Sequence, residues 1–502
     1  MSIDSREIVT LENLRVVTRA RSLAYGITLM LIGILEILWY GSTDSKLHTT
    51  IQFGYNTATV WPVVATIWRI ILLIAGLAIV GVALRAKNLP RLARLARLFE
   101  TIRGARTIAA LIGAYLVLWP VLLWLGINHG GQLRTMTVPV ALTGYFFGIL
   151  SIVAGGLTAW KRFDRSSSGL MYAGLLLFLL GFLIWVARGS LNLELTGILA
   201  SAVAVATFLM FGSLSGTLCE RSGVVNIAIE GQFIVGALAS IVFASAFKGS
   251  GISLTFALLL AGVLGAFFGW VLATMALRYG ANQIIVGVVI VAFCTAMSQF
   301  LTTQVLDVHQ NLNGSYGLPV WAIPGLSHIP LLGPVLFDQN VLVFIAFIAV
   351  IIANFALFRT RWGLRVRSVG EKPIASETVG INVVRVRYGA VILGGFVAGV
   401  GGAGFTLGPG SPFTYGMTAG YGYIALAIMI FGRWRPYGAL MASLLFGFTI
   451  ALSANLNLYL SQLVIPQQFI TALPYLITIA VVSGLVGRIR PPAADGVPFQ
   501  RH

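Results

Sequence analysis

The sequence predicts an all-α fold, a polytopic transmembrane helical bundle with about fourteen apolar segments. Of its 502 residues, 58% are hydrophobic and only 10% are charged, and the mean hydropathy is +0.92. An ordinary soluble domain is about a quarter charged. The apolar runs are continuous over about 18 to 25 residues, the length of a helix that crosses a bilayer, whereas a membrane barrel would show roughly ten-residue alternating strands.

Polar connections separate the apolar runs along the whole chain. The runs 231–248 and 418–432 are the shortest, so either can be re-entrant if its freed backbone is buried in protein. The even number of runs places both termini on the same side of the membrane. The runs lie near residues 22–41, 61–84, 107–127, 138–160, 169–187, 196–218, 231–248, 252–276, 284–303, 338–358, 388–409, 418–432, 436–456 and 467–487.

The net charge of +18 reports the topology of the chain. If both termini are cytoplasmic, the inner segments carry 28 Lys and Arg residues and the outer loops carry four, which is the asymmetry of the positive-inside rule. Basic residues that are spread in this way do not indicate a nucleic acid partner. No cleavable signal peptide is evident, because about twenty polar residues precede the first apolar run.

The first region, residues 1–190, holds about five predicted spans and no recognisable motif, so we interpret it as an accessory membrane region. Glu36 and Arg69 lie inside the first two spans. Since an unpaired charge in a bilayer costs at least ~2.5 kcal/mol, we predict a structural ion pair over a role in the transport pathway. A basic amphipathic helix near 90–103 is predicted to lie on anionic membrane lipids, with a docking surface as the alternative.

A polar, glycine-containing stretch at 220–232 separates two apolar runs. Interrupted helices occur at membrane depth where they are buried or line a cavity, and transporter sites often use them. The alternative is a plain cytoplasmic turn. Asn226 and Glu230 are four residues apart and would share one face of a helix, so we predict that they shape the substrate path or the helix break that supports it.

A second break at 279–283 offers amide groups without charge at Asn282 and Gln283. Such groups suit a nucleobase-like or polyhydroxylated solute. They can equally cap a helix, which is the common use of polar side chains in such loops.

The longest inner loop runs from Arg359 to Arg387 and carries seven basic residues. Pro373 is suited to the first turn of a helix, and Gly380 is suited to its end. Although a basic loop is also a topology signal, a short helix between these two residues indicates a surface for a protein partner.

Four motifs in this order resemble the permease subunits of bacterial ABC importers for nucleosides, a branch of the family that also imports ribose and related sugars. The resemblance covers about residues 196 to 490. The motifs are ERSGVVNIAIEG at 220–231, GANQIIVG at 280–287, RTRWGLRVRSVGEKPIASETVGINV at 359–383 and GYIALAIMIFGRWRPYGAL at 422–440.

The resemblance implies a permease core at 191–490, a cytoplasmic tail at 491–502, and a coupling helix at 371–381 that docks on a separate ATPase. Two positions depart from the family pattern: residue 374, commonly basic, is Ile, and residue 283, commonly Glu, is Gln. The second departure leaves the identity of the solute open. The residues assigned to ATPase coupling are Glu371, Pro373, Ala375, Ser376, Glu377 and Gly380.

The chain contains no Gly-Lys pair and therefore no Walker A loop, so it cannot bind ATP in that manner. The resemblance implies that an ABC ATPase subunit binds ATP and Mg²⁺, and that this chain holds no cofactor. It further implies a second, related permease subunit in a heterodimer, an extracytoplasmic substrate-binding lipoprotein, and a multi-pass location in the bacterial inner membrane with both termini cytoplasmic.

Three other functions are weaker. A sugar or vitamin importer of the same architecture is the nearest alternative. An ion-coupled secondary transporter would show inverted repeats, which we do not find in the sequence, and few carboxylates lie within the spans. A membrane enzyme or metal site has little support, because the five histidines and two cysteines lack metal-ligand spacing.

Overall fold

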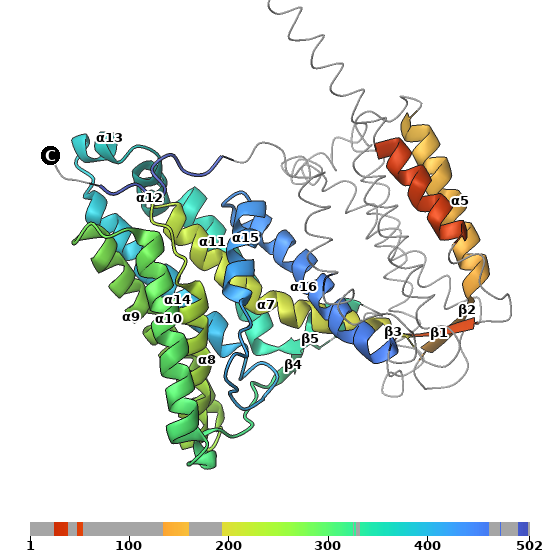
Figure 1. The fold of residues 1–502 in the computed structure, drawn as a ribbon, viewed down its shortest axis with the longest axis horizontal. Helices are drawn as coiled ribbons and strands as arrows, with labels where there is room; N and C mark the ends of the chain where they lie inside the picture. The colour runs from red at the N-terminus through yellow and green to blue at the C-terminus, as the bar shows by residue number, and fades with distance from the viewer. Residues whose placement is uncertain are drawn as a thin grey trace, which may run out of the picture. The chain divides into compact units, whose positions relative to one another are not determined.

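A computed structural model describes residues 25–38, 48–53, 134–159, 193–324, 326–327, 332–460, 472 and 490–499. The chain divides into two compact units, Met1–Thr196 and Gly197–His502 (Figure 1). The predicted spans at 61–84, 107–127 and 169–187 lie outside the described residues, as do the amphipathic helix near 90–103 and all but residue 472 of the run at 467–487.

Within the first unit, two apolar helices pack through glycine. These are the helix Tyr25–Glu36 and α5 (Val140–Ala159), and both lie within predicted spans. A Cβ atom on Gly33 would lie 2.5 Å from the carbonyl oxygen of Gly148, and one on Gly155 would lie 2.7 Å from the carbonyl oxygen of Gly26. The order of these contacts makes the two helices antiparallel.

Short strands occur in the connections, which the sequence analysis did not anticipate. In the first unit, β1 (His48–Phe53) lies between β2 (Arg134–Pro139) and β3 (Leu193–Glu194); it pairs antiparallel with β2, His48 opposite Pro139, and parallel with β3. In the second unit, β4 (Val320–Ala322) pairs antiparallel with β5 (Asp338–Asn340). The described helices of spanning length confirm the predicted helical membrane bundle.

Seven of the described helices are long and apolar enough to cross a membrane. They confirm the runs predicted between residues 196 and 456, with one exception at 418–432. They are α7 (Leu195–Glu220), α8 (Ile229–Ala246), α9 (Gly251–Leu277), α10 (Gln283–Leu301) with the π-helical turn η2 (Thr302–Leu306), α11 (Val341–Arg359), α14 (Val383–Ala403) and α16 (Pro436–Leu460).

The exception is α15 (Tyr421–Phe431), which has only 11 residues. At about 1.5 Å per residue it extends about 16 Å, roughly half the hydrocarbon thickness. The helix cannot cross a bilayer by itself, so the count of fourteen spans is not confirmed. Its start is set by Gly420, whose φ of 79° is left-handed.

The remaining short helices of the second unit are η3 (Gln310–Leu312), η4 (Gly333–Phe337), α12 (Arg361–Glu371) and α13 (Pro373–Thr378).

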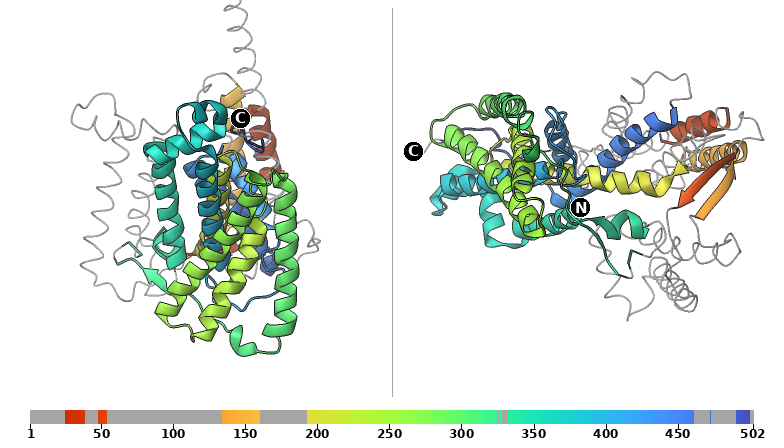
Figure 2. Two further views of the ribbon diagram at one scale, coloured as in Figure 1. Left: turned by 90° about the vertical axis from the view of Figure 1, so that its left-hand side faces the viewer. Right: turned by 90° about the horizontal axis from the view of Figure 1, so that it is seen from below.

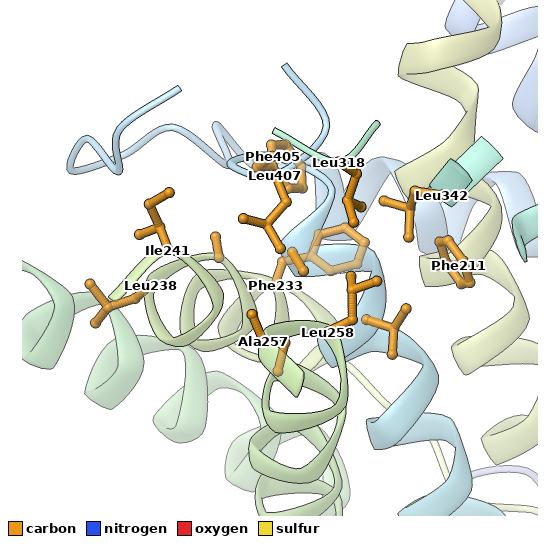
Figure 3. Close-up of a cluster of buried hydrophobic side chains, with 14 of the residues drawn as sticks. Phe211, Phe233, Leu238, Ile241, Ala257, Leu258, Leu318, Leu342, Phe405 and Leu407 are labelled. Atoms are coloured by element: carbon orange, nitrogen blue, oxygen red, sulfur yellow. The ribbon is translucent and has the colours of Figure 1, made fainter. Parts of the chain in front are cut away.

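Helices α8, α9 and α14 pack against one another in the second unit (Figure 2). Their glycines allow backbones to meet: a Cβ on Gly236 of α8 would lie 2.2 Å from the Gly399 oxygen of α14, and one on Gly265 of α9 would lie 2.3 Å from the Gly395 oxygen. Small residues of this kind let membrane helices approach closely. An apolar cluster packs around these helices, and it includes Phe211, Phe233, Leu238, Ile241, Leu258, Leu342, Phe405 and Leu407 (Figure 3).

Candidate transport and coupling site

Residues 221–228, which we call the break, return the chain into the bundle. Helix α7 ends at Glu220, yet Ile229 at the start of α8 packs against Gly216, a full turn before that end. Helix α15 also begins inside the bundle, because the rings of Tyr421 and Phe208 lie 5.3 Å apart, twelve residues before the end of α7. The break therefore turns back beside the last turn of α7, and a role in an interrupted membrane segment stays a prediction.

Asn226 holds the break against α7 and α8. Its Nδ2 donates to Ser215 Oγ and to Gln232 Oε1, both at 3.2 Å. Asn226 and Gln232 are fully buried. Among the described residues, Asn226 Oδ1 and Gln232 Nε2 have no hydrogen-bond partner. The contacts made by Asn226 support the helix break, the second of the two roles predicted for it.

Glu230 joins the start of α8 to the start of α15. Its Oε1 accepts hydrogen bonds from Thr418 Oγ1 at 2.6 Å and from the Gly420 amide at 3.0 Å, and its Oε2 accepts from the Gly422 amide at 2.6 Å. These amides belong to the first turn of α15, where a negative charge also interacts favourably with the helix dipole. A Cβ on Gly422 would lie 2.5 Å from the Glu230 nitrogen, so only glycine allows this approach. Glu230 is 5% exposed, and both of its carboxylate oxygens accept hydrogen bonds from residues of this chain.

Asn282 and Gln283 fix the start of α10. Asn282 is the N-cap, and its Oδ1 accepts from the amides of Ile284 at 2.9 Å and Ile285 at 3.3 Å. Gln283 is buried, and its Oε1 accepts from the Val225 amide at 2.8 Å. Asn282 therefore has the capping use given as the alternative, while Gln283 ties α10 to the break. A direct contact of these residues with solute stays a prediction.

The predicted short helix is present as α13, which begins at Pro373. Gly380 follows its end with a φ of 85°, and its amide donates to the Glu377 oxygen at 2.9 Å. Ser376 is buried, whereas Ile374 and Val379 are 62% and 73% exposed. Ile374 lies within α13 and Val379 directly follows it, so two apolar side chains are exposed at this helix. Of the other assigned residues, Ala375 is exposed, Glu377 is half-buried and Glu371 ends α12.

Several segments converge where α12 leads into α13, and we call this end of the bundle the coupling face. Trp434, in the turn between α15 and α16, donates from Nε1 to Glu220 Oε2 at 2.6 Å. Arg221 donates from Nε to the Trp434 oxygen at 2.9 Å. A Cβ on Gly370 of α12 would lie 2.2 Å from the Arg221 oxygen. Burial lowers the pKa of Arg221, and the nearby Glu371 carboxylate opposes that shift.

Sequence reasoning missed two parts of the coupling face. Glu220 and Trp434 were quoted only within longer motifs, and their pairing joins residues 214 positions apart. Residues 491–502 were assigned only to a cytoplasmic tail, yet the Ala494 amide donates to the Gly370 oxygen at 2.9 Å. Burial raises the pKa of Asp495 to about 6, and this carboxyl faces Glu220, Arg387 and Cys219.

The remaining predicted sites are partly described. Glu36 is fully buried beside Ser151 of α5, whereas Arg69 lies outside the described residues, so their ion pair stays a prediction. Cys219 and Cys294 are both free and buried. Within the part of the chain that the structure describes, no group of three His, Cys, Asp or Glu side chains could hold a metal ion.

The described helices of spanning length and the connections packed between them define a polytopic α-helical membrane protein. The family described as "Branched-chain amino acid transport system / permease component" matches residues 197–482, more than half of the chain. The chain belongs to this family.

Relatives with curated names cover about three-fifths of the chain. It is 37% identical over 305 residues to the nucleoside ABC transporter permease protein NupC of Lactococcus lactis, covering 60% of this chain and 96% of that protein. The guanosine ABC transporter permease protein NupQ of Bacillus subtilis is also 37% identical, with 60% and 96% covered. The putative glucose ABC transporter permease protein TsgC13 of Haloferax volcanii is 33% identical, with 58% and 92% covered. No solved structure matches.

Proposed function

We propose that this chain is the membrane-spanning subunit of an ATP-driven importer of nucleosides. The observation that carries the proposal is 37% identity over 96% of the length of two permeases whose names state nucleoside and guanosine transport. A sugar importer is the second candidate, because the relative named for glucose transport is 33% identical.

In this proposal the coupling face lies in the cytoplasm, and α13 docks on a separate ABC ATPase that binds ATP and Mg²⁺. The exposed side chains of Ile374 and Val379 support such a contact. A second permease chain, an extracytoplasmic binding lipoprotein and the inner-membrane lipids complete the assembly. Residues 1–190 form an accessory region, since the family match begins at residue 197.

Uptake of radiolabelled guanosine and glucose by cells that carry the complete system tests the proposal. We expect uptake of guanosine that depends on the ATPase and is inhibited by unlabelled nucleosides but not by glucose. Uptake that persists without any ATPase would contradict an ABC importer, and uptake of glucose alone would favour the second candidate.

A pair of glycine variants tests the coupling helix. Gly380 and Gly280 both have positive φ, 85° and 66°, and both have open space where a Cβ would lie. Alanine therefore adds a similar backbone cost at the two positions. We expect Gly380→Ala to lower ATP-driven uptake several-fold and Gly280→Ala to leave it near the unmodified level. Equal effects of the two variants would contradict the coupling role.

A further inference from the structure

The C-terminal residues 490–499, which we call the tail, lie on the coupling face (Figure 1). The Ala494 amide donates to the Gly370 oxygen at 2.9 Å, and the Ala493 amide donates to Glu371 Oε2 at 3.3 Å. Gly370 and Glu371 end α12, directly before the linker Lys372 to α13. Ala494 is only 7% exposed. The tail is therefore bonded to the end of α12 through its backbone, and a small side chain is enclosed there.

The same tail contacts α14 through Arg387, which is fully buried. Arg387 Nη1 donates to the Val497 oxygen at 3.2 Å, and the guanidinium carbon lies 5.9 Å from the centre of the Phe499 ring. A cation over an aromatic face is attractive, more so when water is excluded. Arg387 comes five residues after the N-cap of α14, so these contacts fix the tail to the start of that helix.

The tail also covers the break. Gly223 has a φ of 90°, and a Cβ there would lie 2.7 Å from Arg387 Nη2 and 2.9 Å from the Ala494 oxygen. Asp495 of the tail also faces the carboxyl group of Glu220 at the end of α7. The tail thus contacts three segments that are far apart in the sequence: the end of α7 with the break, the end of α12, and the start of α14.

From these contacts, we propose that the tail is a clamp that keeps the break, α12 and α14 together. Because the break leads directly into α8, a displacement of α13 is then passed on to α8. The inference rests on the proposed function, because it assigns α13 to the ATPase contact. The tail stays docked throughout the transport cycle. It is a positioning element: it touches neither solute nor nucleotide.

Thiol labelling of the purified full chain measures docking without reference to any solute. The native cysteines are buried, so a new cysteine provides the accessible thiol. We expect maleimide to label Ala494→Cys at least tenfold more slowly than Ala493→Cys, because the side chain at 494 is buried and the one at 493 is exposed. Equal labelling rates would overturn the docked arrangement.

Leucine substitutions at the same two positions test the effect on coupling in the complete transporter. Ala494→Leu cannot fit the enclosed position, whereas the side chain of Ala493→Leu points to solvent. We expect Ala494→Leu to reduce guanosine imported per ATP hydrolysed at least threefold, and Ala493→Leu to leave that ratio unchanged. If the unmodified complex imports guanosine and Ala494→Leu keeps the same ratio, the clamp is refuted. If the unmodified complex imports no nucleoside, the proposed function fails instead.

A cross-link decides the matter if Ala494→Leu does not fold. The double variant Ala493→Cys with Glu371→Cys places thiols on two exposed residues that are joined by the hydrogen bond from the Ala493 amide to Glu371 Oε2. We expect a short bismaleimide to link the two thiols and ATP-driven uptake to stay above half of the level of the untreated double variant, because the clamp remains docked. Absence of the link, or loss of uptake in the linked double variant but not in the treated single variants, would refute the proposal.

Discussion

Replacing Glu230 by glutamine tests whether this carboxylate joins the starts of α8 and α15. Glutamine keeps one oxygen, which can still accept from Thr418 and Gly420, but its NH₂ group replaces Oε2 and then opposes the Gly422 amide, 2.6 Å from that atom. A hydrogen bond to a charged group contributes about 1.5–3 kcal/mol, and a buried donor left unsatisfied costs about 1–3 kcal/mol. We expect a loss of about 2–4 kcal/mol.

The assay is thermal unfolding of the detergent-purified protein, followed by the fraction that remains monodisperse. At about 2–4 °C per kcal/mol, the melting temperature should fall by roughly 4–16 °C. Asp307→Asn is the matched control, because it makes the same chemical change on an exposed side chain and should move the melting temperature by less than about 2 °C. If the Glu230→Gln variant has the same melting temperature as the unmodified protein but a higher KM for solute, Glu230 binds solute and our reasoning is wrong.

Three further predictions concern the helix crossing, the coupling face and pH. Gly236→Ala should destabilise the protein by about 1–3 kcal/mol, because its Cβ would meet the backbone of α14. The control Gly389→Ala places its Cβ in open space and should melt at the same or a higher temperature than the unmodified protein. The opposite order of melting temperatures would contradict this packing. Trp434→Phe should lower the melting temperature, since it leaves a buried carboxyl without its donor at a cost of about 1–3 kcal/mol; unchanged melting would refute the pairing. The pKa of Asp495 is about 6 in the docked tail, above its ordinary value of 3.8, so the docked tail holds this proton more tightly than an undocked tail would. Docking therefore strengthens as the pH falls from above 6 towards 4. Labelling of Ala494→Cys relative to Ala493→Cys should therefore be slower at pH 5 than at pH 7.5, and a faster relative rate at pH 5 would contradict the sign.

Local sequence rules predicted the parts of the site that depend on neighbouring residues. Pro373 and Gly380 act on the backbone within one or two turns, so the start and end of α13 could be read directly. The N-cap role of Asn282 follows from its contacts with the next two or three amides, and it stood among the alternatives. Apolar length likewise indicated the helices of the second unit, because the bilayer imposes one thickness on all of them.

Long-range partners could not be predicted in this way. Glu230 and the first turn of α15 are about 190 residues apart, and nothing in either motif specifies the other. The length of α15 was overestimated, since the preceding residues 418–420 are apolar or small enough to extend the run while their backbone turns to meet a carboxylate. The tail carries no spanning segment or motif, so only the fold reveals that it contacts Gly370 and Arg387.

The glycine crossings at Gly236, Gly265 and Gly399 also determine which parts of the second unit can move. Backbones in direct contact leave no side-chain layer that could change rotamer and absorb a shift, so we expect α8, α9 and α14 to move as a single rigid body. Reorientation during transport must then be accommodated by segments without a continuous hydrogen-bond ladder. We expect the irregular residues 404–420, which follow α14, to be the place where such a change occurs.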